Sequence, residues 1–206
     1  MKIIVADDHA VVRKGLKQIL LEMSGVKAVE EVDNGPALIE RITKENFDFV
    51  ILDISMPGQS GLLTLKEIKD RKPKLPVLIL SIHPEEQYAL RSLRDGASGY
   101  LTKDSAPEEL VRAIQKILSC HKYITQTLAD KLVNNFGDKL PHELLSDREY
   151  EVFSMIAVGK TMTGIADELS LSVKTVSTYK SRIYDKMDMK SRTEITLYAI
   201  HNELIK

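Results

Sequence analysis

The sequence predicts an α/β fold over residues 1–120, followed by a smaller all-helical domain. Two observations predict this organisation: short apolar runs alternate with amphipathic segments five times before residue 120, and no strand-like run follows it. Strands that alternate with helices form a parallel sheet with helices on both faces. The first and third apolar runs are almost free of polar residues, which is typical of central strands in such a sheet.

The expected strands and helices of the first domain follow one another in strict alternation. The strands are expected at residues 2–7, 26–32, 47–53, 75–82 and 98–103. Leucine, isoleucine and valine recur between them at three- and four-residue spacing, which indicates amphipathic helices. These helices are expected around residues 12–20, 38–42, 62–68, 90–93 and 110–118. Turn residues such as Asn34-Gly35, Pro57-Gly58 and Asp95-Gly96 lie between the elements.

The rest of the chain has a helical pattern. Residues 125–136 are expected to form a helix and residues 137–143 a linker. Ser146 and Glu149 fit a capping box for a helix that Gly159 ends. A short helix around residues 165–169, a tight turn, a long helix over 173–187 and a last helix over 194–204 are expected to follow. Short helices joined by a tight turn are typical of a helix-turn-helix.

The composition excludes several classes of protein. The 206 residues are 43% hydrophobic and 29% charged, as in soluble globular proteins. No apolar run approaches the roughly 18 residues of a membrane span, and the first residues meet acids too early for a signal peptide. The single cysteine cannot form an internal disulfide, and the five histidines are too scattered to predict a zinc site. We therefore expect a cytoplasmic protein.

Three carboxylates follow the ends of two expected strands. Asp7 and Asp8 end the first strand and Asp53 ends the third. Ligands of an open parallel sheet bind beyond the carboxyl ends of its strands, so the three acids converge if those strands are neighbours. Acids this close repel one another unless a cation joins them, and Mg²⁺ prefers oxygen ligands. The sequence therefore predicts a magnesium site.

Two further strand ends add a hydroxyl and an ammonium group to the same edge. Ser81 ends the fourth expected strand, and Lys103 follows the fifth. A metal ion and Lys103 can offset the charge of a phosphoryl group, Ser81 can donate a hydrogen bond to it, and an aspartate can act as the nucleophile. These residue types together indicate an aspartyl phosphate.

The ordered set of residues resembles the receiver domain of bacterial two-component response regulators. The set comprises Asp7-Asp8, Asp53 followed closely by "MPG", Ser81, Tyr100 and Lys103. The resemblance implies a flavodoxin-like five-stranded parallel sheet, in which Asp53 accepts phosphate from a histidine kinase. It also implies that Asp8, Asp53 and the Ser55 carbonyl ligate Mg²⁺, that Asp7 helps through water, that Ser81 and Tyr100 change position, and that Lys103 pairs with the phosphoryl group.

Each of these residues also has an ordinary structural interpretation. Asp7 or Asp8 alone could cap a helix, Lys103 could be a surface lysine, Tyr100 a packing residue and Ser81 a strand-end hydroxyl. The main alternative for the whole set is an aspartate-nucleophile phosphatase. Such enzymes have an Asp-x-Asp motif on the first strand. This chain instead has adjacent aspartates there, and its single nucleophile candidate lies on the third strand.

A basic segment lies in the helical domain. Residues 172–192 contain six basic residues and two acidic ones, so the segment carries a charge of +4 although the whole chain carries −1. In the long helix expected there, Val176, Lys180, Ile183 and Met187 share one side, and the opposite side shows small polar residues edged by cations. Such a face can approach a DNA major groove. The alternative is a solvated helix face.

Residues 145–195 resemble the LuxR-type helix-turn-helix that ends NarL/FixJ-type response regulators. The matching features are "SDRE", Ala157, Gly159, "IADELSLS", "KTV", "KM" and "SRTE". The resemblance implies that the helix over 173–187 reads DNA. Ser177, Thr178 and Ser181 would face bases, and Lys174, Thr175, Lys180 and Arg182 would hold mainly phosphates. Gly164 and Tyr179 depart from the usual pattern, and "TVSTYKSRIYDK" resembles the GacA/UvrY branch.

Together these features predict a phosphorylation-controlled transcription factor rather than an enzyme. The expected domains are a receiver over 1–120, a helical linker over 121–143 and a DNA-binding domain over 144–206. The expected partners are a sensor histidine kinase, double-stranded DNA and a second copy of the chain on DNA, with no membrane. A regulator that binds RNA or a protein through its helical tail is the remaining alternative.

Overall fold

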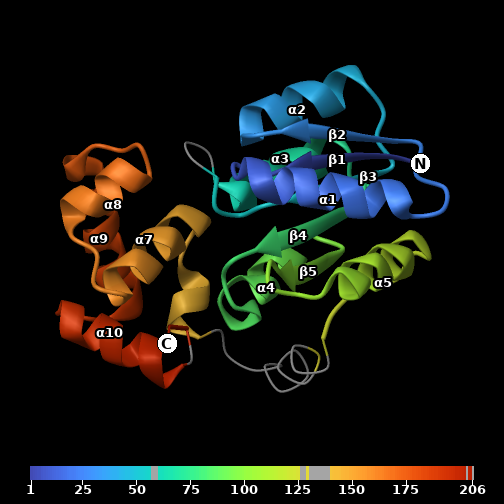
Figure 1. The fold of residues 1–206 in the computed structure, drawn as a ribbon. Coiled ribbons are helices and arrows are strands. Elements are labelled where there is room, and N and C mark those ends of the chain that lie inside the picture. Colours follow the sequence, from blue (N-terminus) through green and yellow to red (C-terminus); the bar gives the residue numbers. More distant parts are fainter. Residues whose placement is uncertain (57–59, 126–128, 130–139, 203, 206) are drawn as a thin grey trace. The chain divides into compact units, whose positions relative to one another are not determined.

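The computed structural model divides the chain into two compact units, Met1–Ala129 and Asp130–Lys206. It describes residues 1–56, 60–125, 129, 140–202, 204 and 205 (Figure 1). Residues 126–128 and 130–139, which include most of the helix expected over 125–136 and the first three residues of the linker expected over 137–143, lie outside the described residues, as does the Pro57-Gly58 turn. The domain limits at residues 120 and 144 stay a prediction.

The first unit contains a parallel five-stranded sheet in the order β2-β1-β3-β4-β5. Its strands are β1 Lys2–Ala6, β2 Ala28–Val32, β3 Phe49–Leu52, β4 Val77–Ser81 and β5 Gly99–Thr102. β3 and β4 are buried at every residue, as are all of β1's residues after Lys2. The prediction that the apolar runs form a buried parallel sheet is confirmed, and β1 and β3 are neighbours with Ala6 opposite Leu52.

Helices cover both faces of this sheet (Figure 1). They are α1 Ala10–Glu22, α2 Gly35–Lys44, α3 Gly61–Arg71, α4 Glu85–Arg94 and α5 Pro107–Leu118. Leucines and isoleucines of α1 and α5 join one buried cluster with strand residues such as Ile3, Phe49 and Leu78. Successive strand side chains point to opposite faces, so Ile4, Val50 and Ile79 are buried on the other face, where α2 contacts β1.

Polar caps set the start of α2 and α3, and a glycine allows α3 to begin close to the end of β3. The Asn34 side chain accepts a hydrogen bond from the Ala37 amide at 2.8 Å, and Ser60 caps α3 by accepting from the Leu62 amide at 3.2 Å. Gly61 donates its amide to the Ile54 carbonyl at 3.0 Å. Its Cα lies so close to the residues after β3 that a Cβ would be 2.2 Å from the Asp53 carbonyl oxygen. The start of α3 therefore packs directly under Asp53.

The second unit is helical throughout its described residues. It contains a 3-10 turn at Pro141–Leu144, then α7 Asp147–Ala157, α8 Met162–Glu168, α9 Val173–Met187 and α10 Arg192–His201. Ser146 and Glu149 form the predicted capping box at the start of α7. Gly159 has a φ of +97° where α7 ends, which is the left-handed conformation that glycine adopts most easily.

The helix-turn-helix has the predicted order but α10 ends earlier than expected. α8 and α9 are joined by a tight turn in which the Leu171 amide bonds the Ala166 carbonyl at 2.8 Å. α10 ends at His201 because the buried Leu204 turns back and donates its amide to the Ala199 carbonyl at 2.8 Å. No helix in the described part of the chain combines the length and apolar character needed to cross a membrane.

Candidate functional site

The two strand-end aspartates lie together because β1 and β3 are paired in register. Asp7 and Asp53 directly follow Ala6 and Leu52, which are opposite one another. The Asp53 amide donates to the Ala6 carbonyl at 2.9 Å, so the pairing continues past the end of β3. Asp7 is 2% exposed and Asp53 is 1% exposed. The sequence thus places two carboxylates in the protein interior, which requires a nearby cation.

Lys103 supplies that cation. Its Nζ lies 2.7 Å from Oδ2 of Asp7 and 2.7 Å from Oδ2 of Asp53, and its side chain is 10% exposed. Burial alone lowers the pKa of the Lys103 ammonium, but its hydrogen bonds to both acids outweigh burial and raise this pKa overall. Burial raises the pKa of the Asp53 carboxyl, and the hydrogen bonds from Lys103 and the Ser55 amide offset this only in part. Lys103 therefore stays charged and bridges the two acids.

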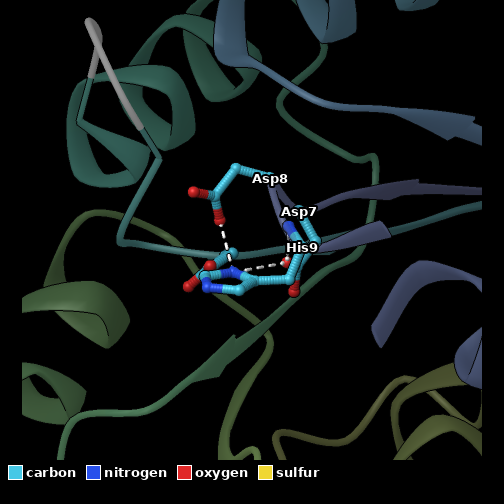
Figure 2. Close-up of side chains that lie close together, drawn as sticks. Asp7, Asp8 and His9 are labelled. Atoms are coloured by element: carbon cyan, nitrogen blue, oxygen red, sulfur yellow. Dashed lines mark hydrogen bonds and ion pairs between the residues drawn. The ribbon is translucent and has the colours of Figure 1, made fainter. Parts of the chain in front are cut away.

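Asp7, Asp8, His9 and Asp53 form a cluster that can hold a metal ion. Each offers one ligand atom, and these atoms lie within 4.8 Å of one another. Figure 2 shows Asp7, Asp8 and His9 converging at the end of β1. Three carboxylates beside one lysine leave excess negative charge, and carboxylate oxygens suit a hard divalent cation. The residues present therefore fit the predicted Mg²⁺, while ligation by the Ser55 carbonyl stays a prediction.

Ser81 and Tyr100 meet at the backbone of His83. Ser81 is fully buried, and its hydroxyl accepts a hydrogen bond from the His83 amide at 3.2 Å. Tyr100 is 1% exposed and donates its hydroxyl to the His83 carbonyl at 2.8 Å. The His83 ring contacts the Ser55 hydroxyl at 3.0 Å through Nε2. One residue thus joins both predicted switch side chains to the loop that follows Asp53.

His9 and His83 are the residues that the sequence reasoning missed. In the sequence both belong to a scattered set of histidines that lacks zinc-ligand spacing. Position along the chain could have indicated them, since His9 directly follows Asp8 and His83 lies two residues after Ser81. The structure brings both to the same edge of the sheet as the predicted acids.

The long helix α9 has the predicted inner and outer faces. Val176, Ile183 and Met187 are buried, and Lys180 is half-buried with Nζ 5.2 Å from the centre of the Tyr184 ring. The outer side chains are exposed at Lys174, Ser177, Thr178, Ser181 and Arg182, and Thr175 is half-buried. The Thr178 hydroxyl donates to the Lys174 carbonyl at 3.1 Å, and the Ser181 hydroxyl donates to the Ser177 carbonyl at 3.2 Å. Both oxygens keep lone pairs that can accept from an outside donor.

Two exposed cations of the basic segment, Lys186 and Arg192, bond groups of their own domain. Lys186 Nζ lies 2.6 Å from the buried Glu149 carboxylate of α7. Arg192 donates to the carbonyls of Ile156 at 3.3 Å and Lys160 at 3.0 Å. Burial raises the pKa of Glu149, but hydrogen bonds from Lys186 and Ser146 outweigh burial and lower this pKa overall. The sequence charge of +4 therefore overstates the charge available to a partner.

Comparisons with known proteins match both units. A family model described as "Response regulator receiver domain" matches residues 3–115, and one described as "Bacterial regulatory proteins, luxR family" matches residues 143–199. The chain is 36% identical to "Oxygen regulatory protein NreC" of Staphylococcus haemolyticus, over 100% of this chain and 99% of that protein. It is 35% identical to NreC of Staphylococcus epidermidis over 100% of both.

Two solved structures of RcsB bound to DNA match nearly the whole chain. RcsB from Salmonella enterica serovar Typhimurium, bound to promoter rprA in the presence of the phosphomimetic BeF3-, is 28% identical with a TM-score of 0.70. That match covers 96% of this chain and 97% of RcsB. A further RcsB–DNA complex is 27% identical with a TM-score of 0.60, and it covers 100% of this chain and 99% of that one.

Proposed function

This chain belongs to the two-component response regulators that join a receiver domain to a LuxR-family DNA-binding domain, and we propose that Asp53 is its phosphoacceptor. The proposal rests on the contact of the Lys103 ammonium with the buried Asp53 carboxylate at 2.7 Å. A cation already held against the nucleophile is placed to offset the charge that a phosphoryl group brings. Chains of this family are DNA-binding transcription regulators, so the phosphatase alternative is set aside.

Phosphorylation transfers a phosphoryl group from a histidine of the sensor kinase to one Asp53 oxygen. The P–N bond of the phosphohistidine breaks as the new P–O bond forms, and the kinase histidine leaves with the electron pair. Asp7, Asp8, Asp53 and the Ser55 carbonyl would hold Mg²⁺, which neutralises charge on the phosphoryl oxygens when it is bound. Lys103 exchanges part of its contact with the acids for the phosphoryl group.

Ser81 and Tyr100 carry the change away from Asp53. The Ser81 hydroxyl donates a hydrogen bond to the phosphoryl group, and this changes its bond with the His83 amide. Since Tyr100 is bonded to the carbonyl of the same residue, its position follows. Phosphorylation thereby shifts the face formed by α4 and β5 between two pre-existing states.

DNA is bound through the outer face of α9. Ser177, Thr178 and Ser181 face base edges, and the cations and hydroxyl at the rim contact mainly phosphates. These rim residues are Lys174, Thr175, Lys180 and Arg182. RcsB, whose structure on promoter DNA matches nearly the whole chain, supports this assignment. The Thr178 and Ser181 hydroxyls accept hydrogen bonds from base amino groups, since their own protons bond the helix carbonyls.

A second copy of the chain pairs with the first on DNA. α10 buries Ile195 and Ala199 but exposes Leu197 at 61% and Ile200 at 54%. A helix with apolar residues on both sides leaves one of them available for another apolar surface. A twofold dimer supplies the same surface and matches the symmetry of paired DNA half-sites. The protein acts in the cytoplasm, where its kinase and DNA are accessible.

Asp53→Ala tests the phosphoacceptor. Incubation of the parent with Mg²⁺ and acetyl phosphate should give hydroxylamine-labile phosphate, and Asp53→Ala should give none. Asp70→Ala is the matched control, because Asp70 is an exposed aspartate on α3. Labelling of Asp53→Ala at the parental level would show that another residue accepts the phosphate.

Genome-wide footprinting of parent and Asp53→Ala proteins tests the output. The parent should protect a defined set of DNA sites, and the variant should protect fewer of them under phosphorylating conditions. Equal protection by both proteins would show that DNA binding does not depend on Asp53. Absence of DNA affinity even in low salt would favour RNA or a protein as the partner of the helical domain.

A further inference from the structure

Residues 121–125, which follow α5 and are called the strap below, lie along the outer edge of β5. β5 is the last strand in the sheet order, and the edge of a sheet offers backbone groups to any segment that can pair with them. Tyr123 forms a parallel bridge with Gly99, and its amide donates to the Ser98 carbonyl at 2.9 Å. The start of the linker expected over 121–143 is therefore attached to the receiver sheet.

The Tyr123 side chain holds the strap beside α5. It packs against the buried cluster that α1, α5 and the strands share, and its hydroxyl donates to the Glu109 carboxylate at 2.9 Å. Burial and the bond to Glu109 raise the pKa of the Tyr123 phenol, so the hydroxyl keeps the proton that it donates. A Cβ on Gly99 would lie 2.9 Å from the Tyr123 Cβ and 3.0 Å from its carbonyl oxygen. The glycine at the start of β5 thus allows the strap to approach this closely.

Two side chains of the strap contact opposite ends of α4. Lys122 Nζ donates to the carbonyl of Leu93, in the last turn of this helix, at 3.2 Å. The Thr125 hydroxyl donates to the carboxylate of Glu85, which is the first residue of the helix. The strap therefore contacts α4, β5 and α5 together.

Both attachments lie next to the predicted switch residues. Glu85 follows His83 by two residues, and the His83 amide and carbonyl bond the side chains of Ser81 and Tyr100. Tyr100 directly follows Gly99, the residue that pairs with the strap. A side-chain hydrogen bond is lost once its atoms separate beyond about 3.5 Å. A small shift of the start of α4 is therefore sufficient to separate Glu85 from the strap.

We propose that the strap, held to α4 by the bond between Thr125 and Glu85, is docked in the unphosphorylated protein and leaves β5 and α4 when Asp53 carries a phosphoryl group. The proposal rests on the proposed function, which supplies the shift of α4 and β5. Release adds residues 121–125 to the chain that connects the receiver to the DNA-binding unit. An extended segment of this length spans up to about 17 Å, so phosphorylation increases the distance that the DNA-binding unit can reach from its receiver.

Amide exchange, measured by NMR on the full-length ¹⁵N-labelled protein, tests release of the strap. The Tyr123 amide is protected by its bond to Ser98, and Mg²⁺ with the phosphomimetic BeF3- should speed its exchange about tenfold or more. The Glu45 amide, which bonds the Arg41 carbonyl at the end of α2, is the internal control and should keep its rate. Asp53→Ala should abolish the response of Tyr123.

Thr125→Val tests the bond to Glu85, because valine keeps the shape of threonine but lacks its hydroxyl. Without BeF3-, the Tyr123 amide of this variant should exchange about threefold to tenfold faster than that of the parent. Coupling between two equilibria is reciprocal, so the variant should also bind BeF3- more tightly in the presence of Mg²⁺. Thr43→Val is the matched control, since Thr43 is an exposed threonine of α2. It should match the parent in both measurements.

Two results would overturn the proposal: Tyr123 exchange that BeF3- does not change, or Thr125→Val that matches the parent. If the amide signals of Ser81 and Tyr100 still shift with BeF3-, the proposed phosphorylation switch survives and only the release of the strap is wrong. If neither signal shifts and the parent takes no phosphate from acetyl phosphate, the proposed function is wrong as well.

Discussion

A methyl group at Gly61 should displace Asp53, the proposed phosphoacceptor. The Cβ of alanine at this position would lie 2.2 Å from the Asp53 carbonyl oxygen and 2.6 Å from the Ile54 Cα. Both are backbone atoms, so no flexible side chain can move aside. Either α3 or the segment that carries Asp53 must shift, and this shift would move the carboxylate relative to Lys103.

The loss of stability in Gly61→Ala can be compared with the effect of the same substitution at a second glycine of the unit. Forcing a methyl group into packed structure costs about 1–3 kcal/mol, which corresponds to about 2–4 °C of melting temperature per kcal/mol for a chain of this size. Gly15 lies within α1, is exposed, and would have nothing within 4 Å of its Cβ. Alanine there should stabilise the helix by about 1 kcal/mol. The two Gly→Ala changes should therefore have opposite signs.

Thermal unfolding followed by circular dichroism measures the change in stability. The rate of Asp53 labelling by acetyl phosphate measures the displacement of the carboxylate. Gly61→Ala should melt lower than the parent and label more slowly, whereas Gly15→Ala should melt higher and label at the parental rate. If Gly61→Ala matches the parent in both measurements, the close packing of α3 against Asp53 does not position the phosphoacceptor.

Two further predictions concern the DNA-binding unit. The lowered pKa of Glu149 stabilises the fold at pH values above its ordinary pKa of 4.5, and this stabilisation is lost as pH falls through the lowered value. Lys186→Met should therefore cost about 1 kcal/mol at pH 7, a modest value because Lys186 is partly exposed. The difference in melting temperature between Lys186→Met and the parent should shrink below pH 4.5. A difference that does not change with pH would contradict the ion pair. Arg182→Ala should reduce the salt dependence of DNA affinity by about one unit of slope, whereas Thr178→Ala should keep the slope and alter the preference among DNA sequences. Fluorescence anisotropy over a range of salt checks both, and equal slopes for Arg182→Ala and the parent would argue against a phosphate contact.

The sheet could be predicted from sequence because burial on both faces leaves a strong local pattern. Continuous apolar runs such as residues 49–52 are buried at every position, and each lies between turn residues that limit its length. The convergence of Asp7 and Asp53 needed one further condition, that the first and third strands are neighbours. The observed strand order meets it, so the candidate phosphoacceptor pocket follows from strand ends alone.

Side-chain direction could not be predicted in the same way. Lys186 and Arg182 lie four residues apart in one basic helix and both are exposed, yet the Lys186 ammonium bonds a buried carboxylate of its own domain. That bond depends on Glu149, an acid 37 residues before Lys186, whose burial is set by the packing of α7 on α9. A count of charges along the chain contains no information about such a partner.

The position of His83 explains how a strand-end hydroxyl can affect a tyrosine on the neighbouring strand. Ser81 binds the amide of His83 and Tyr100 binds its carbonyl, so the two switch side chains are connected through the backbone of one residue. Because both bonds use backbone atoms of His83, the proposed coupling between Ser81 and Tyr100 does not require histidine at this position. The imidazole adds a third connection, to the hydroxyl of Ser55. A movement of Ser81 can therefore reach Tyr100 through the backbone of His83, and a movement of Ser55 can reach it through the ring of His83. Only the second route depends on the identity of the side chain.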